Sequence, residues 1–251
     1  MIPKIIHYIW FGRKPYPPKI LTCIASWKKF LPDYEFKLWN EESFDISNAC
    51  LFVRQAYANK KYAHVSDYVR LWALYNYGGF YLDTDVEVIR RWSDDLCQNY
   101  AGYSLDESGY LSVVMFSEKA NPVFRGLLDI YDAMPFVNSD GTFNMEVNNT
   151  YIQNELSKMG YNKKNVYQVL NDGSIVYPDD YFHCRSLTTG KLHITDNSVT
   201  IHWHTITWVS AKTKFLNFLR IHILVPLLGT RFYSKISKCI KGDKSSFWSN
   251  Q

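Results

Sequence analysis

The chain has 251 residues, a formal net charge of +4 and 17% aromatic residues. This length suffices for one substantial α/β domain, or two small ones, with a full core. Residues 1–211 carry 20 basic and 23 acidic residues (−3), whereas residues 212–251 carry eight basic residues and one acid (+7). The acidic body excludes nucleic acid as an expected partner, and the basic tail suits an anionic membrane surface.

The five cysteines are scattered and show no C-x-x-C spacing. This pattern argues against a disulfide framework or a zinc site and favours reduced thiols in a cytosolic compartment. The N-terminal sequence MIPKIIHYIW has no basic leader, long apolar core or small-residue cleavage site. We therefore expect a cytoplasmic protein.

The first part of the chain alternates between strand and helix patterns. An unbroken apolar run over residues 5–10 is typical of a buried parallel strand. A proline pair opens an amphipathic helix over residues 17–31, residues 34–39 alternate as a strand, and a helix is expected over residues 49–60. This order predicts right-handed crossovers and a mainly parallel sheet.

Residues 64–87, HVSDYVRLWALYNYGGFYLDTDVE, divide into a helical and an extended half at Gly78-Gly79. Ser66 and Asp67 suit the first turn of a helix, and the glycines supply its stop. The aromatic and β-branched residues that follow are typical of a strand. We expect a helix, a glycine turn and a strand that carries the D-x-D sequence.

Asp83 and Asp85 would share one face of such a strand. Two carboxylates about 6–7 Å apart repel each other by roughly 2–3 kcal/mol at an effective dielectric constant of about 20. Mg²⁺ or Mn²⁺ would offset this cost and keep positions open for substrate. The alternative for a lone D-x-D is that one Asp caps the next turn and the other is solvated.

The unit SDYVRLWALYNYGGFYLDTDVE resembles the signature of the DXD-containing glycosyltransferases of family 32, which include yeast initiating mannosyltransferases and bacterial capsule enzymes. Clostridial glucosylating toxins carry a similar segment. The residues in the family's order and spacing are Ser66, Asp67, Arg70, Leu74, Gly78, Gly79, Tyr81, Leu82, Asp83 and Asp85. The resemblance implies a GT-A-like, Rossmann-like α/β fold, Mn²⁺ or Mg²⁺ as cofactor, and transfer with retention of configuration.

The resemblance also implies roles for individual residues. Asp83, Asp85 and Arg70 would be catalytic, and Asp85 and His202 would meet the metal. Without the resemblance, the residues favour a core position for Trp10 and a surface ion pair between Asp67 and Arg70. The residues that would bind the nucleotide-sugar are Ile9, Trp10, Asp67, Arg70, Tyr81, Asp83 and Trp208.

Past the D-x-D sequence, residues 100–105 and 110–117 are expected to be strands and residues 121–134 a helix. The acidic loop at 106–109 is either an ordinary turn or a contact for an acceptor hydroxyl. Residues 135–165 are polar and depart from the family pattern. Acceptor specificity is expected there.

Residues 198–203 alternate as a strand within VTIHWHTITW. The family often ends its catalytic domain with a segment like IHHWAGSW. His202 and Trp208 match the first His and the last Trp of that segment, but positions 203 and 204 are exchanged. Whether His202 or His204 approaches the metal therefore stays open.

Residues 212–251 form a basic, aromatic tail behind the expected domain of residues 1–211. The apolar run at 215–228 contains Arg220 and Pro226 and is shorter than the ~20 residues of a spanning helix. Its flanking bases and aromatic residues fit an interfacial amphipathic helix. The alternative is a helix docked on the domain.

Together these features predict a metal-dependent hexosyltransferase at the inner face of the cell membrane. It would move a sugar from a nucleotide-sugar, with a UDP-sugar favoured, to a hydroxyl of a glycan or polyprenyl-linked glycan in bacterial capsule or O-antigen synthesis. A metal-dependent phosphohydrolase is the first alternative, but it would need further clustered carboxylate or His ligands to activate water, and the sequence offers few. A catalytically silent membrane-associated scaffold would not need the intact Asp67, Arg70, Asp83 and Asp85.

Overall fold

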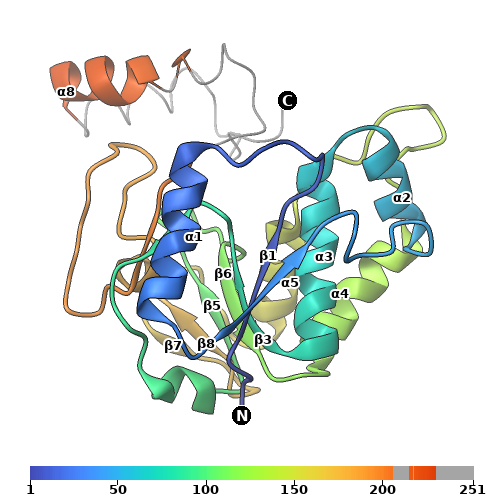
Figure 1. Ribbon diagram of the computed structural model, residues 1–251, viewed down its shortest axis with the longest axis horizontal. Coiled ribbons are helices and arrows are strands. Elements are labelled where there is room, and N and C mark those ends of the chain that lie inside the picture. The colour runs from blue at the N-terminus through green and yellow to red at the C-terminus, as the bar shows by residue number, and fades with distance from the viewer. Residues whose placement is uncertain (206–214, 217, 230–251) are drawn as a thin grey trace.

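The computed structural model describes residues 1–205, 215, 216 and 218–229. Figure 1 shows a central sheet with helices on both faces and the described tail segment beyond one end of the sheet. The elements are β1 (Ile5–Ile9), α1 (Pro18–Phe30), β2 (Glu35–Trp39), α2 (Leu51–Ala58), α3 (Tyr62–Tyr77), β3 (Gly79–Leu82), β4 (Val86–Val88), η1 (Asp94–Gln98), β5 (Ala101–Ser104), β6 (Val114–Ser117), α4 (Pro122–Ala133), α5 (Asn148–Lys158), β7 (Gln168–Val169), β8 (Ile175–Tyr177), α6 (Asp179–Phe182), β9 (Thr200–His202), η2 (Arg220–Leu224) and α8 (Val225–Leu228).

The central sheet has seven strands in the order β2-β1-β3-β6-β5-β8-β7. Strands β2, β1, β3, β5 and β8 run in one direction, and β6 and β7 run against them. The predicted α/β fold with a mainly parallel sheet is therefore confirmed. The antiparallel β6 follows β5 through the segment that contains the acidic loop.

Strand β1 lies between β2 and β3 and pairs in parallel with both. The chain leaves β1 through α1 to reach β2 on one side, and it returns through α2 and α3 to β3 on the other. The carboxyl ends of β1 and β3 therefore flank a topological switch point, where open α/β sheets bind their ligands. Asp83 directly follows β3 at this point.

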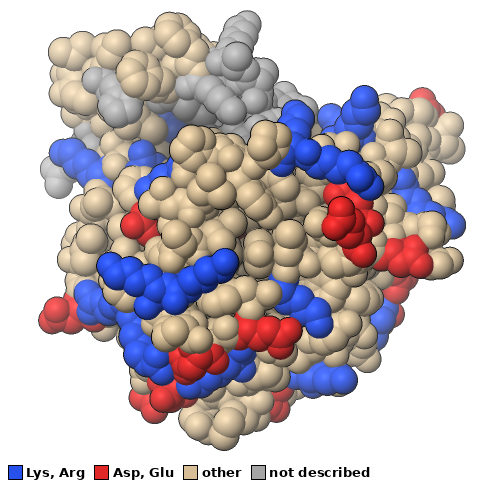
Figure 2. Space-filling model, in the orientation of Figure 1, with Lys and Arg blue, Asp and Glu red and all other residues tan. Residues whose placement is uncertain are grey.

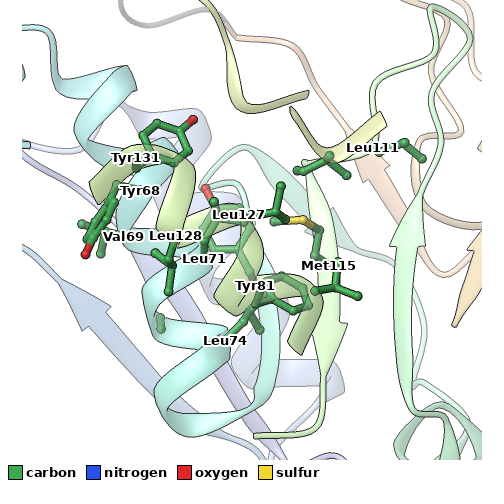
Figure 3. Packing of buried hydrophobic residues seen from close by; sticks show 14 of the residues in the cluster. Tyr68, Val69, Leu71, Leu74, Tyr81, Leu111, Met115, Leu127, Leu128 and Tyr131 are labelled. Carbon is green, nitrogen blue, oxygen red and sulfur yellow. The ribbon is translucent and has the colours of Figure 1, made fainter. Parts of the chain in front are cut away.

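Two apolar cores cover the two faces of the sheet, because side chains alternate along each strand. Tyr81 of β3 belongs to the core formed with α3 and α4, which Figure 3 shows from close by. Its neighbours Phe80 and Leu82 belong to the opposite core, which contains Trp27 of α1. The end of β3 is thus fixed from both sides.

Helix α3 begins at Tyr62, four residues before Ser66. The expectation that Ser66 and Asp67 lie in its first turn is therefore wrong. No breaker precedes them, the amides of His64 and Val65 bond to the carbonyl of Lys61, and Val65 is fully buried. Packing of the early turn extends the helix and places Asp67 one turn inside it.

The D-x-D sequence is a turn, and the predicted strand through Asp85 is wrong. Strand β3 ends at Leu82, and the amide of Val86 donates to the carbonyl of Asp83 at 3.0 Å. The chain turns because Val86 and Val88 are buried beneath α1, where the Trp27 indole donates to the Val86 carbonyl at 2.7 Å. These residues form β4, which pairs with β9 in a separate two-stranded sheet.

The other strands and helices predicted up to residue 134 are confirmed. The largest change of boundary is at β6, which begins at Val114 and not at residue 110. The strand expected at 198–203 is β9, although it lies in the small sheet and not the central one. Helix α5 in the polar region 135–165 was not predicted. Cys23, Cys50, Cys97 and Cys184 are free thiols.

The described part of the tail comprises residues 215, 216 and 218–229, including η2 and α8. It contacts the domain through Arg220, which donates to the carbonyl of Leu187 at 3.1 Å. The expected domain boundary after residue 211 lies outside the described residues. In the part of the chain that the structure describes, no helix is both long and apolar enough to cross a membrane.

Gly79 begins β3 with a φ of +97°, and a Cβ placed there would lie 2.6 Å from the carbonyl oxygen of Ile5. We expect Gly79→Ala to lower the free energy of unfolding by about 2–4 kcal/mol, through backbone strain and this clash. Urea denaturation would measure the loss. Gly126→Ala is the matched control, because a Cβ in this part of α4 meets nothing within 4 Å. It should stabilise by about 0.5–1 kcal/mol, and equal losses in both variants would contradict this prediction.

Candidate active site

Arg70 of α3 lies between two carboxylates at the end of β3. Its Nη2 is 3.3 Å from Asp67 Oδ1, and its Nη1 is 3.3 Å from Asp83 Oδ1. Nη1 also donates to the carbonyl of Ser112 at 2.8 Å. The guanidinium therefore joins α3, the D-x-D turn and the segment before β6.

The Arg70 and Asp67 side chains are only 9% and 11% exposed, so the surface ion pair favoured by the residues alone is wrong. Burial raises the pKa of both Asp67 and Asp83, and Arg70 opposes the shift in each case. Burial would lower the pKa of Arg70, but Tyr81 and the two carboxylates raise it above its usual value. A buried network of this kind is costly to break at one member.

Tyr81 supports the same network from β3. Its hydroxyl donates to Asp83 Oδ1 at 2.5 Å, and its ring lies 4.5 Å below the Arg70 guanidinium. Burial raises the pKa of this phenol well above its usual value. Tyr81 is thus placed to orient Asp83, and its ring is part of the core.

Asp85 is held from the opposite side by the end of β9. His202 Nε2 lies 3.3 Å from Asp85 Oδ1, and Thr205 donates its amide and hydroxyl to Asp85 Oδ2 at 2.7 and 3.0 Å. His204 adopts a left-handed backbone with φ of 53°, which turns the chain back toward Asp85. Thr205 was missed by the sequence analysis, because a turn after the histidines was not expected.

Asp83, Asp85 and His202 each offer a ligand atom, and these atoms all lie within 4.8 Å of one another. Two carboxylate oxygens and one imidazole nitrogen suit Mn²⁺ or Mg²⁺ and leave positions for other ligands. His204 stands outside this group: its Nε2 faces the carbonyl of Arg185, although its ring lies 3.9 Å from that of His202. The residues present fit a divalent cation, and the geometry favours His202 over His204.

Asp85 and His202 support each other's charged forms. Burial would raise the pKa of Asp85, but His202 and the Thr205 donors hold it below its usual value. Burial would lower the pKa of His202, yet the Asp85 carboxylate raises it. A cation at this point would compete with a proton for His202 Nε2.

Strand β1 pairs with β3, but the residues at its end do not join the charged contacts described above. The side chain of Ile9 is buried in the core, and the amide of Trp10 donates to the carbonyl of Trp39. The Trp10 ring is partly exposed and lies 5.0 Å from the ring of Tyr16, with its N–H donated to the Lys14 carbonyl. The core position expected for Trp10 from the residues alone is therefore wrong.

Of two other predicted features, the structure describes only the acidic loop. Trp208 lies outside the described residues. Asp106 in the acidic loop accepts from the amides of Ser108 and Tyr110 at 2.8 Å, so it shapes its own turn. A cavity of about 550 Å³ opens between the segment after β2 and helices α3 and α4, and none of the site residues lines it.

Residues 17–102 match the family model described as the glycosyltransferase sugar-binding region containing DXD motif. The match covers 86 of the 251 residues. The matched region includes α1, α3, β3 and the D-x-D turn. It therefore contains Asp67, Arg70, Asp83 and Asp85, whereas His202 lies beyond it.

Two curated proteins similar to this chain come from Schizosaccharomyces pombe. Inositol phosphoceramide mannosyltransferase 3 is 39% identical over 88 residues, which cover 34% of this chain and 24% of the relative. Inositol phosphoceramide mannosyltransferase 2 is 30% identical over 135 residues, or 50% of this chain and 37% of the relative. The chain thus spans only about a quarter to two fifths of these relatives.

Solved structures of two glycosyltransferases are also similar. PaToxG glycosyltransferase has a TM-score of 0.41 and 24% identity, over 51% of this chain and 59% of that one. A glycosyltransferase involved in glycosylation of the major capsid of PBCV-1 has a TM-score of 0.45 and 13% identity, over 81% of this chain and 95% of that one.

We expect Arg70→Met to lower the free energy of unfolding by about 3–5 kcal/mol, because Asp67 and Asp83 would lose their buried counter-ion. Arg125→Met is the matched control. Arg125 of α4 also contacts two carboxylates, Asp129 and Asp132, but it is 37% exposed and should contribute less than about 1 kcal/mol. Urea denaturation of both variants tests this, and similar losses would show that burial of the Arg70 network has no energetic weight.

Proposed function

We propose that the protein is a metal-dependent glycosyltransferase that uses a nucleotide-sugar donor and transfers its sugar to a hydroxyl group of a glycan. The observation that carries this proposal is the convergence of Asp83, Asp85 and His202 at the end of β3, beside the buried Asp67–Arg70 pair. This arrangement lies at the switch point of an α/β sheet, and most of it falls within the matched sugar-binding region.

The roles follow from the chemistry of each group. Asp85 and His202 would hold the cation, and Asp83, which directly follows β3, offers a third ligand atom. A bound divalent cation neutralises the charge that develops on a diphosphate leaving group. Asp67 and Arg70 would bind hydroxyls of the ribose or the donor sugar, because a carboxylate accepts and a guanidinium offers several donors in one plane. Tyr81 would orient Asp83, and Trp10 would pack against the base.

The donor and acceptor are narrower proposals. A UDP-sugar is our first choice, through the resemblance to glucosylating toxins, and a GDP-sugar is the second. The names of the two curated relatives make mannose a sugar to test. The resemblance to capsule enzymes supports retention of configuration and a glycan or polyprenyl-linked glycan acceptor of bacterial surface polysaccharide, such as capsule or O-antigen.

A metal-dependent phosphohydrolase is less well supported. Such an enzyme needs several ligands clustered to activate water. Within residues 1–205 and the described tail positions, Asp83, Asp85 and His202 form the only cluster of three or more potential ligands. A silent scaffold is disfavoured because the site residues are intact and held together by specific contacts.

Thermal unfolding with UDP, GDP and their sugars, each with Mn²⁺ or EDTA, tests this function. We expect one nucleoside diphosphate to raise the melting temperature only when Mn²⁺ is present, since a ligand stabilises the state that binds it. His202→Asn should remove this metal-dependent shift. His204→Asn is the control and should retain it, because Asn tolerates the left-handed backbone at this position. No shift with any nucleotide, or loss in the His204 variant alone, would contradict the assignment.

We also propose that the tail contacts an anionic membrane at the cytoplasmic face. Seven large apolar side chains in residues 215–228 are at least 40% exposed: Phe215, Leu216, Phe218, Ile223, Leu224, Leu227 and Leu228. In Figure 2 this segment presents mainly uncharged surface, with Lys and Arg side chains of the domain close by. Residues 212–251 add eight basic residues and one acid. Exposed apolar side chains next to basic ones fit an anionic lipid surface.

Leu227 is 77% exposed, and Phe218 is 54% exposed. We expect the double variant Phe218→Gln and Leu227→Gln to sediment less with phosphatidylglycerol vesicles than the unchanged protein does, because it loses apolar area for insertion. Val169 of the edge strand β7 is 67% exposed, so Val169→Gln is the matched control and should sediment normally. Equal sedimentation of all three proteins would exclude the tail as a membrane contact.

A further inference from the structure

The small sheet that carries His202 needs support beyond its own strands. Strands β4 and β9 have three residues each and pair as Val86 with His202 and Val88 with Thr200. A two-stranded pair of this length is marginal alone. Helix α1 fixes one side, where the amide of Val88 donates to Ser26 Oγ at 2.9 Å. A different set of contacts must fix the end of β9, where the proposed metal ligand lies.

Lys19, Glu87 and Trp203 form a closed cluster at this end. The Trp203 indole donates to Glu87 Oε2 at 2.7 Å, and Lys19 Nζ lies 3.0 Å from the same oxygen. Lys19 Nζ also lies 3.3 Å from the centroid of the Trp203 ring, which makes a cation–π contact. Each member of the Lys19–Glu87–Trp203 cluster therefore contacts the other two.

The cluster is directly connected to both proposed metal ligands. Trp203 follows His202 in the chain, and its amide donates to the carbonyl of Asp85 at 3.1 Å. Glu87 lies two residues after Asp85, on β4. A shift of the Trp203 ring would therefore move His202 relative to Asp85, whose candidate ligand atoms must converge on one cation.

We propose that Glu87, acting through Trp203 and Lys19, is a positioning residue that sets the spacing of His202 and Asp85 for a divalent cation. This inference rests on the metal site of the proposed function and assigns it a support that lies outside the ligands. Partners that orient metal ligands typically change metal affinity 10–100-fold when they are removed. Glu87 does not contact the cation itself, so its effect is on geometry.

Because the cluster is partly exposed, an effect of Glu87 on metal binding can be distinguished from an effect on global stability. The side chains of Lys19 and Glu87 are 35% and 25% exposed, and ion pairs with this much solvent contribute little to global stability. Asp33 gives a matched comparison. It is 35% exposed and also binds two cationic side chains, Lys4 and Arg91, but none of these residues belongs to the candidate site.

Mn²⁺ titration followed by electron paramagnetic resonance tests the proposal on the full chain. We expect Glu87→Ala to weaken Mn²⁺ affinity about tenfold, while Asp33→Asn binds like the unchanged protein. Glu87→Gln keeps an acceptor for the Trp203 indole and should recover most of the affinity. Wild-type affinity in Glu87→Ala, or an equal loss in Asp33→Asn, would overturn the proposal.

Hydrogen exchange in EDTA provides a readout that needs no metal. Amides in residues 198–205 should exchange faster in Glu87→Ala and at the normal rate in Asp33→Asn. If Glu87→Ala does not fold, Lys19→Met and Trp203→Phe each remove one contact of the cluster, and unchanged Mn²⁺ affinity and exchange in both would overturn the proposal. If Glu87→Ala exchanges faster but the unchanged protein binds no Mn²⁺, the metal site would be overturned. Glu87 would then only stabilise β9.

Discussion

The placement of Arg70 between Asp67 and Asp83 is the constraint on which the candidate site depends. A buried guanidinium must be matched by carboxylates, here the buried Asp67 and the half-buried Asp83, so the second turn of α3 and the end of β3 have to lie at fixed positions. Gly78 and Gly79 make this possible, because their positive φ angles let α3 turn directly into β3. The Tyr81 hydroxyl also donates to Asp83, and Arg70 also donates to the carbonyl of Ser112. The charge network thus fixes the half of the site nearest the central sheet.

The other half depends on packing more than on charge. The turn at Asp83–Asp85 leads the chain out of the central sheet, since Val86 and Val88 are buried beneath α1. Strand β9 pairs with β4, and this pairing brings His202 close to Asp85. The D-x-D turn therefore joins two sheets that are held by different interactions. A cation bound there would contact both.

The sequence predicted those parts of the fold that depend on local patterns. The apolar run of β1, the amphipathic α1 and the glycine stop after α3 all have signals within one element. The turn at Asp83–Asp85 was not predictable in this way, because aromatic and β-branched residues continue on both sides of it and only burial under α1 ends the strand. The same applies to the depth of the Asp67–Arg70 pair, where spacing gives a shared helix face but not what covers it. Ser112 carries no sequence signal at all, since it acts through its main-chain carbonyl. The family resemblance supplied His202, and the structure gave the reason to prefer it to His204.

The separation of the two halves along the chain has a consequence for assembly. Asp85 and Thr205 are joined by a hydrogen bond although 120 positions separate them in the chain. Proteins are made from the N-terminus, so α3 and the D-x-D turn leave the ribosome long before β9 does. The partners of the Arg70 guanidinium lie at or before Ser112, and the amide of Asn148 adds a later contact to Asp67. The partners of Asp85, in contrast, are absent until synthesis has passed residue 205, and the metal half of the site is completed last.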